Sequence, residues 1–302
     1  MRMKAPLTFT SGDSCRKSAT LSFKKDMHGR GFKKAHDGDG DGVEGDRQGY
    51  AMTRSSGAFS AQQYPCEKCP LRPLQAFRPF CEEELAFVKR FKKGELAIGK
   101  GTTVLVEGSH SAHLYTVLSG WGFRYKLLSD GRRQILNYVV PGDLIGLQGS
   151  LMGEMQHSLE ALSPMLLCVF ERDQLPELYR DHPGLAYDIT WLASREEQML
   201  DENLLSVGRR TAIERAAYLI AFIHARAKSV GLNRNTSEIP ITQQHIADTL
   251  GLSLVHTNKT LRKLIERKLI SWKDGACKVL DAETLQKIAR WSGISEECRP
   301  LV

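Results

Sequence analysis

The sequence of 302 residues has no apolar run long enough to cross a membrane. Its longest nearly uninterrupted run, residues 216–223, is about eight residues long, whereas a membrane-spanning helix needs at least about eighteen. Arg2 and Lys4 are not followed by an apolar stretch, so a cleaved secretion signal is not indicated either. These absences predict a cytoplasmic protein with no membrane partner.

The residue patterns of common enzymes are also missing. The chain has no Ser-His-Asp spacing, no phosphate-binding loop and no His-Glu-x-x-His pair. Its seven cysteines are an odd number, and a reducing compartment does not favour a disulfide framework. We therefore expect a protein that is not an enzyme and that folds by burying apolar side chains.

Large apolar side chains are scarce in residues 1–63, which are rich in Gly, Ser, Asp and Lys. Such a composition cannot offset the entropy of ordering, so we predict a disordered extension. Asp37, Asp39 and Asp41 have the spacing of a calcium loop, but Gln48 stands where a bidentate Glu is required. That mismatch argues against a calcium site. The internal Met52 leaves open whether translation begins there.

The net charge of +7 is concentrated towards the C-terminus. Residues 208–302 hold about sixteen Lys and Arg against about nine Asp and Glu, and the rest of the chain is balanced. A basic C-terminal part predicts a polyanionic partner such as double-stranded DNA, because each neutralised phosphate releases counterions. Solvated surface charge is the alternative explanation.

Short alternating apolar runs separated by glycine turns fill residues 91–171, which is typical of an antiparallel β-roll. The predicted strands are residues 102–106, 113–118, 122–128, 133–140, 158–162 and 165–171. After Pro183 the period changes to three- and four-residue steps, which predicts a long helix. Its stripe consists of Ile189, Leu192, Glu196, Met199, Asn203 and Leu204. We expect this stripe to pair with a second copy of the chain, giving a homodimer, and burial against the chain's own core is the alternative.

Residues 241–270 have the pattern of a helix-turn-helix. Thr242 and Ser253 can each cap a helix, and Gly251 supplies the turn between the two helices. The side chains expected to point inward are Ile246, Ala247, Leu250, Leu254, Leu261, Leu264 and Ile265. Two short strands around Asp274-Gly275 then predict a wing. A helical hairpin with solvated charges is the alternative.

Polar and basic side chains lie along the outward face of the second helix. The residues expected at the DNA interface are Ser253, Val255, His256, Asn258, Lys259, Arg262 and Lys263. Their spacing would present hydrogen-bond donors to a major groove lined by phosphates.

These parts together resemble the Crp/Fnr family of bacterial transcription regulators, over residues 64–290. The resemblance is carried by Leu118-Ser119-Gly120, by Pro141-Gly142-Asp143-Leu144-Ile145-Gly146 and by residues 241–270. It implies an α+β fold with an N-terminal antiparallel, jelly-roll-like β-roll, a long dimerisation helix and a C-terminal winged helix-turn-helix. The implied domains are the extension 1–63, a cysteine-bearing segment and sensor roll 64–183, the dimerisation helix 184–207, the DNA-binding domain 208–290 and a tail 291–302.

The resemblance also implies which residues read DNA and which partners are needed. Val255, Asn258 and Lys259 match the base-facing positions of the family, where Val255 can only make apolar contacts. A palindromic operator, a second copy of the chain and RNA polymerase are the implied partners. The same comparison argues against cyclic nucleotide as a ligand, because Gly146-Leu147-Gln148 lacks the family's acid and Gln156-His157-Ser158 lacks its arginine.

Four cysteines match the arrangement by which oxygen sensors of the family hold a [4Fe-4S] cluster. They are Cys66, Cys69, Cys81 and Cys168. The gap between Cys69 and Cys81 is longer than in the family pattern, which puts Cys81 in doubt. Structural zinc, a redox pair at Cys66 and Cys69, and a relic site without metal remain open.

The sequence therefore predicts a DNA-binding transcription regulator that responds to oxygen or redox state. Two alternatives stay open. One is a constitutive or small-molecule-responsive regulator without a metal cluster, and the other is a cyclic-nucleotide effector that does not bind DNA.

Overall fold

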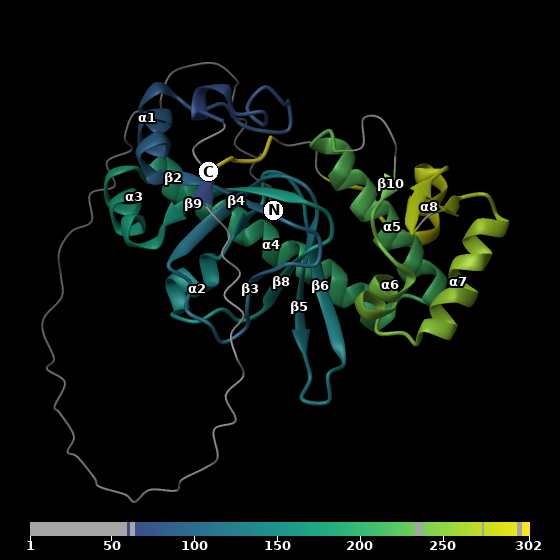
Figure 1. Cartoon of the computed structure of the whole chain (residues 1–302). Coiled ribbons are helices and arrows are strands. Elements are labelled where there is room, and N and C mark those ends of the chain that lie inside the picture. Colours follow the sequence, from purple (N-terminus) through teal and green to yellow (C-terminus); the bar gives the residue numbers. More distant parts are fainter. Residues whose placement is uncertain (1–58, 61–63, 233–237, 274, 295–297) are drawn as a thin grey trace, which may run out of the picture. The chain divides into compact units, whose positions relative to one another are not determined.

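A computed structural model describes residues 59–60, 64–232, 238–273, 275–294 and 298–302 of the chain (Figure 1). The calcium-like loop, Met52 and most of the predicted disordered extension lie outside these residues. Within the extension, strand β1 (Phe59–Ser60) pairs antiparallel with strand β2 (Lys92–Ile98).

Two antiparallel sheets form the predicted β-roll. One has the strand order β1-β2-β9-β4-β7 and the other β3-β8-β5-β6. The remaining strands are β3 (Thr103–Leu105), β4 (His113–Ser119), β5 (Gly122–Leu127), β6 (Arg133–Val139), β7 (Leu144–Ile145), β8 (Ser158–Ala161) and β9 (Met165–Glu171). Strands β2 and β7 were not predicted, because β2 is mostly polar or small in sequence and β7 has only two residues.

Successive side chains of a strand point to opposite faces of the sheet, and they therefore belong to two separate hydrophobic cores. In β4, Tyr115 and Val117 pack inside the roll, whereas Leu114 and Leu118 pack on its other face with the helices. In β9, Cys168 joins this second, helix-covered face. Because side chains alternate along a strand, Cys168 cannot reach the interior of the roll.

The helices and short 3-10 turns of the sensor part lie before, between and after the strands of the roll, and the last of them is the long helix α4. They are α1 (Glu82–Phe91), α2 (Leu147–Met152), α3 (Leu175–Asp181), α4 (Pro183–Arg209) and the short 3-10 turns η1 (Cys66–Lys68) and η2 (Arg172–Gln174). None of the helices in the described part of the chain has the length and apolar character required to span a bilayer.

Most of the predicted pairing stripe of α4 lies against the chain's own roll. Ile189 and Met199 are buried in the chain's own core, and the Asn203 amide donates to the Leu136 carbonyl at 2.9 Å. The expectation that this stripe pairs with a second copy was therefore wrong for these residues, whereas Leu204 is exposed. The exposed residues of α4 with three- and four-residue spacing are Tyr187, Thr190, Ser194, Glu197, Asp201, Leu204 and Gly208.

The C-terminal part has the predicted helix-turn-helix and wing. Its elements are α5 (Ala212–Ser229), β10 (Glu238–Ile239), α6 (Gln243–Leu250), α7 (Leu254–Glu266), β11 (Ile270–Lys273), β12 (Ala276–Val279) and α8 (Ala282–Ala289). The predicted caps are confirmed: Thr242 Oγ1 accepts from the His245 N–H and Ser253 Oγ from the His256 N–H, both at 3.2 Å. Gly251 has φ +64°, a left-handed conformation that glycine adopts without strain.

Strand β6 of the roll contacts helix α6 directly. Arg133 Nε donates to Asp248 Oδ2 at 2.9 Å, and Gln134 Nε2 donates to the Thr249 carbonyl at 2.9 Å. The hydroxyls of Tyr138 and Thr249 lie 2.9 Å apart. The helix-turn-helix is thus anchored to the sensor roll by polar contacts.

Residues 298–302 return to the sensor part of the chain, although no pattern in the sequence indicated it. The Arg299 N–H donates to the Ala76 carbonyl and the Arg78 N–H donates to the Arg299 carbonyl, both at 2.8 Å. Leu301 and Val302 are buried. Residues 299–302 are therefore packed against the sensor part.

Candidate nucleic-acid interface

The outward face of α7 presents the residues predicted to contact DNA. The structure brings Ser253, Val255, His256, Asn258, Lys259, Arg262 and Lys263 together, all of them exposed, along about ten residues of the chain. Val255 is 65% exposed, which is unusual for a β-branched apolar side chain and leaves it accessible to a base edge. This surface can contact phosphates with Lys259, Arg262 and Lys263 and base edges with the rest.

The inward face of α7 differs from the prediction at two positions. Leu261 and Leu264 are buried as expected, but Leu254 and Ile265 are exposed. Thr257 and Thr260 occupy the buried positions instead. The inward pattern was misassigned because two threonines, which are polar in sequence, stand at core positions of the helix.

The wing adds basic residues to the interface that were not predicted from the sequence. Lys273 at the end of β11 and Lys278 in β12 are exposed. The sequence could have indicated them, because one lysine precedes and one follows Asp274-Gly275 at the tip of the predicted wing. Cys277 lies between them and is buried.

Three of the four predicted metal-ligating cysteines line one small cavity beside the roll. Cys66 and Cys69 come from η1 and the residue after it, and Cys168 comes from β9. Lys92, which is buried and bonded to Glu95 at 2.6 Å, lines the same cavity, as does Val302.

Cys81 does not line this cavity. It is the N-cap residue of α1, and its backbone N–H donates to Glu84 Oε2 at 3.0 Å. Within the described residues, no group of three or more His, Cys, Asp or Glu side chains is placed to hold a metal ion. The four-thiolate arrangement that a cluster requires is therefore not formed here.

The cavity does not favour thiolates. Burial raises the pKa of Cys168 to about 12, and burial also raises the pKa of Cys66, while the nearby Lys92 ammonium acts in the opposite direction on both. Metal ligation and nucleophilic attack both require the thiolate. Burial therefore opposes thiolate formation at Cys66 and Cys168, while Cys69 is the half-buried member of the group.

Comparison with known proteins supports both halves of this architecture. Residues 95–182 match the model of the cyclic nucleotide-binding domain, and residues 214–288 match the model of the Crp-like helix-turn-helix domain. The first match spans most of the roll, and the second spans α5 to α8.

Curated relatives are regulatory proteins, and two of the three described below are named as transcriptional activators. The nitrogen fixation regulation protein FixK of Rhizobium meliloti is 32% identical over 176 residues, covering 58% of this chain and 76% of that protein. The transcriptional activatory protein AadR of Rhodopseudomonas palustris is 30% identical over 177 residues, covering 58% and 73%. The transcriptional activator protein FnrL of Cereibacter sphaeroides is 27% identical over 203 residues, covering 66% and 81%.

Solved structures share the fold. FixK2 from Bradyrhizobium japonicum covers 67% of this chain and 98% of its own, with a TM-score of 0.53 and 22% identity. A Crp-family transcriptional regulator from Thermus thermophilus covers 67% and 99%, with a TM-score of 0.56 and 20% identity.

Proposed function

The chain belongs to the Crp/Fnr family of DNA-binding transcription regulators, and we propose that it binds inverted-repeat operators as a homodimer through the outward face of α7. The observation that carries this proposal is the row of exposed polar and basic side chains on α7, opposite a face buried against the rest of the domain. Two copies of α7, one DNA turn or about 34 Å apart, would then read two half-sites. A dimer bound in this way would recruit RNA polymerase to the promoter.

The second copy is expected on the exposed stripe of α4. Tyr187 is 56% exposed and Leu204 is 72% exposed, at opposite ends of a stripe with the three- and four-residue spacing of a coiled coil. Glu197 and Asp201 lie between them and would repel the same acids of the second copy. We therefore expect an association of moderate strength that becomes stronger with added salt, because salt screens this repulsion.

The DNA proposal is tested with a double substitution on α7. Lys259→Ala with Arg262→Ala should lower affinity for operators selected from random duplexes by about 10- to 100-fold and reduce the salt dependence of binding. Lys287→Ala is the matched control, because Lys287 is an exposed lysine on α8 of the same domain. Unchanged affinity in the double variant, measured by gel shift, would rule out α7 as the reading helix.

Oxygen or redox state is the signal that we propose for the cysteine cavity. Three thiols from two segments of the chain lie at the point where residues 298–302 dock on the roll, so oxidation there would disturb that docking. The half-buried Cys69 is where an oxidant would arrive first. A metal cluster is not part of this proposal.

The redox proposal is tested by comparing two buried cysteines. Cys168→Ser should abolish the difference in operator affinity between air and anaerobic buffer, whereas Cys277→Ser, a buried cysteine of the wing, should retain it. Iron and zinc are assayed on the same samples. A parent protein whose affinity is the same in both atmospheres would contradict the proposal and favour a regulator that responds to a different signal.

A further inference from the structure

One apolar side chain stands in the outward row of α7, which consists of Val255, Lys259, Arg262 and Glu266. These residues follow one another at steps of four, three and four, so a helix places them along one face. The opposite, buried face consists of Thr257, Thr260, Leu261 and Leu264. Val255 is 65% exposed and is the apolar member of a row that is otherwise charged.

Packing among the described residues does not account for Val255. Its side chain belongs to neither of the two hydrophobic cores. A β-branched residue also has a lower helix propensity than alanine or the straight-chain polar residues. At an exposed helix position it therefore lowers stability slightly and leaves apolar surface in water. We expect the contact of this side chain to be made with a bound partner.

Val255 stands at the end of α7 that faces the bases in a helix-turn-helix complex. It is the second residue of the helix, directly after the Ser253 cap, whose Oγ accepts from the His256 N–H at 3.2 Å. In such complexes the N-terminal residues of the second helix contact base edges in the major groove. Lys259 and Arg262 lie further along the same row and are available to the phosphates.

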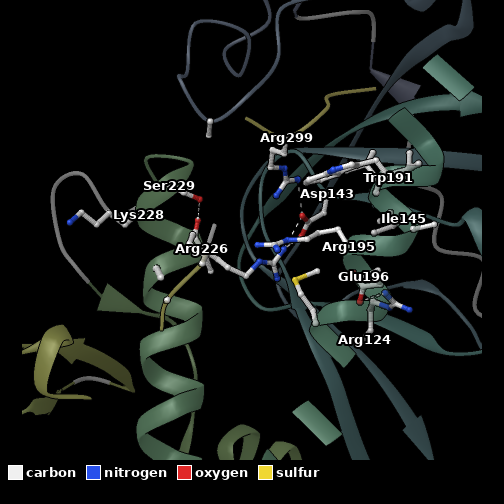
Figure 2. Close-up of a pocket in the computed structure, with 18 of the residues that line it drawn as sticks. Arg124, Asp143, Ile145, Trp191, Arg195, Glu196, Arg226, Lys228, Ser229 and Arg299 are labelled. Carbon is white, nitrogen blue, oxygen red and sulfur yellow. Dashed lines mark hydrogen bonds and ion pairs between the residues drawn. The ribbon is translucent and has the colours of Figure 1, made fainter. Parts of the chain in front are cut away.

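Helix α7 is mounted firmly enough for a small apolar contact to discriminate between bases. Its buried leucines lie in the same hydrophobic core as α5. Arg226 of α5 pairs in turn with Asp143 of the roll at 2.7 Å, and Figure 2 shows Asp143 between Arg226 and Arg299. A gap of about 0.5–1 Å forfeits roughly a quarter to a half of the attraction between apolar groups. A fixed helix is therefore required for such a contact, and these interactions provide one.

We propose that Val255 reads the C5-methyl group of one thymine in each half-site of the operator, which rests on the proposed function. The base edges in the major groove carry donors, acceptors and, on thymine alone, a methyl group. Valine has no donor or acceptor in its side chain, so against any other edge it would leave polar groups desolvated and unpaired. Specificity at this base pair then comes from apolar burial and not from a hydrogen bond.

The expected size of the effect follows from the burial of one methyl group. Such a group contributes about a fourfold change in affinity. An inverted repeat carries the contact twice, so removal of both methyl groups should lower the affinity of the dimer about 15-fold.

Operators that the parent chain selects from random duplexes test the proposal. Each thymine is replaced by deoxyuridine, one symmetric pair of positions at a time, because this exchange removes only the methyl group. We expect one pair of positions to lower affinity by about 15-fold in a gel shift, and Val255→Ala to bind the thymine and uracil operators equally. Ile265→Ala, which shortens an exposed β-branched side chain in the last turn of α7, is the matched control and should keep the parent's ratio.

Leu254 is the competing apolar residue, since it is 42% exposed and lies about 100° around the helix from Val255. Leu254→Ala is therefore measured with the same operators. A ratio that is lost in Leu254→Ala and kept in Val255→Ala would assign the methyl contact to Leu254 and overturn the proposal. So would a parent chain for which no thymine can be distinguished from uracil.

Misfolding does not explain the expected result, because alanine has a higher helix propensity than valine and the site is exposed. The ratio of two affinities of one variant also does not depend on the fraction of folded protein. A chain that selects an operator but is indifferent to the methyl groups contradicts this inference alone. A chain that binds no duplex contradicts the proposed function as well.

Discussion

Thr257 is buried in α7, and its hydroxyl oxygen Oγ1 has no hydrogen-bond partner among the described residues. Its neighbour Thr260 is also buried, but the Thr260 hydroxyl donates to the His256 carbonyl at 2.9 Å. Two residues of the same type on the same face therefore differ in whether the polar group is paired. Such a difference determines how much each hydroxyl contributes to stability.

We expect Thr257→Val to raise the free energy of unfolding by about 1 kcal/mol, because it replaces an unpaired buried hydroxyl with a methyl group of similar size. Thr260→Val removes a formed hydrogen bond and should not raise it. Urea unfolding of both variants measures the difference. Destabilisation by Thr257→Val would show that its hydroxyl is paired in solution.

Helix α6 and strand β6 form the element pair that joins the roll to the helix-turn-helix, and His245 lies at this contact. Its ring packs on Phe123 with a centroid distance of 5.2 Å, and its Nδ1 accepts from the Thr242 N–H at 3.2 Å. Burial, with Arg133 and Lys100 acting in the same direction against Asp248, lowers the pKa of His245 from 6.5 to about 4. The folded state therefore favours the neutral ring.

This preference predicts a loss of stability in acid. Above pH 6.5 the ring is neutral in both states, and between pH 6.5 and 4 the unfolded chain binds a proton that the folded chain does not. We expect His245 to contribute a loss of about 1 kcal/mol between pH 7 and pH 5, because solvent screening at this half-buried ring reduces the full effect. His245→Gln keeps a cap acceptor without titrating. Urea unfolding at both pH values should show a smaller loss in the variant, and equal losses would exclude His245 as the cause.

Features that follow from local chemistry could be predicted from the sequence, because each pattern is compatible with only one local structure. The caps Thr242 and Ser253 and the positive φ of Gly251 follow from local chemistry, and the alternation in β4 and β9 follows from the pleat. The stripe on α4 has two solutions, because an apolar face can be buried by the chain's own roll or by a second copy. Periodicity alone does not distinguish them, and the roll covers most of the predicted stripe.

The sites depend on contacts between distant segments, which spacing does not encode. Cys69 and Cys168 line one cavity although about a hundred residues separate them, whereas Cys81, which is nearer in sequence, caps a helix. Asp143 of the roll and Arg226 of α5 likewise form an ion pair across distant parts of the sequence. Side chains of this kind carry no common motif, so only the fold brings them together.

At the scale of the whole molecule, α4 connects the roll to the DNA-binding part and leaves one face uncovered. That face contains Tyr187, Leu204 and Leu205 as its large exposed apolar side chains. The roll covers the opposite face through Ile189 and Met199. A second copy on the uncovered face would bury the exposed side chains without disturbing either domain.

Leu204→Glu should therefore weaken self-association. A charge placed in an apolar contact is costly to bury, so we expect the dissociation constant of the dimer to rise by at least about tenfold. Leu151→Glu, at an exposed leucine of α2, is the matched control and should leave the dimer intact. Sedimentation velocity over a range of concentrations measures both. Equal dissociation constants for parent and Leu204→Glu would place the interface elsewhere.

The most direct measurement compares protection of a full inverted repeat with protection of one isolated half-site, at equal protein concentration. We expect the purified chain to protect both arms of the repeat together, and at a much lower concentration than it protects the half-site. Equal protection of the half-site would contradict it, because two recognition helices presented by one dimer gain affinity only when both arms are present.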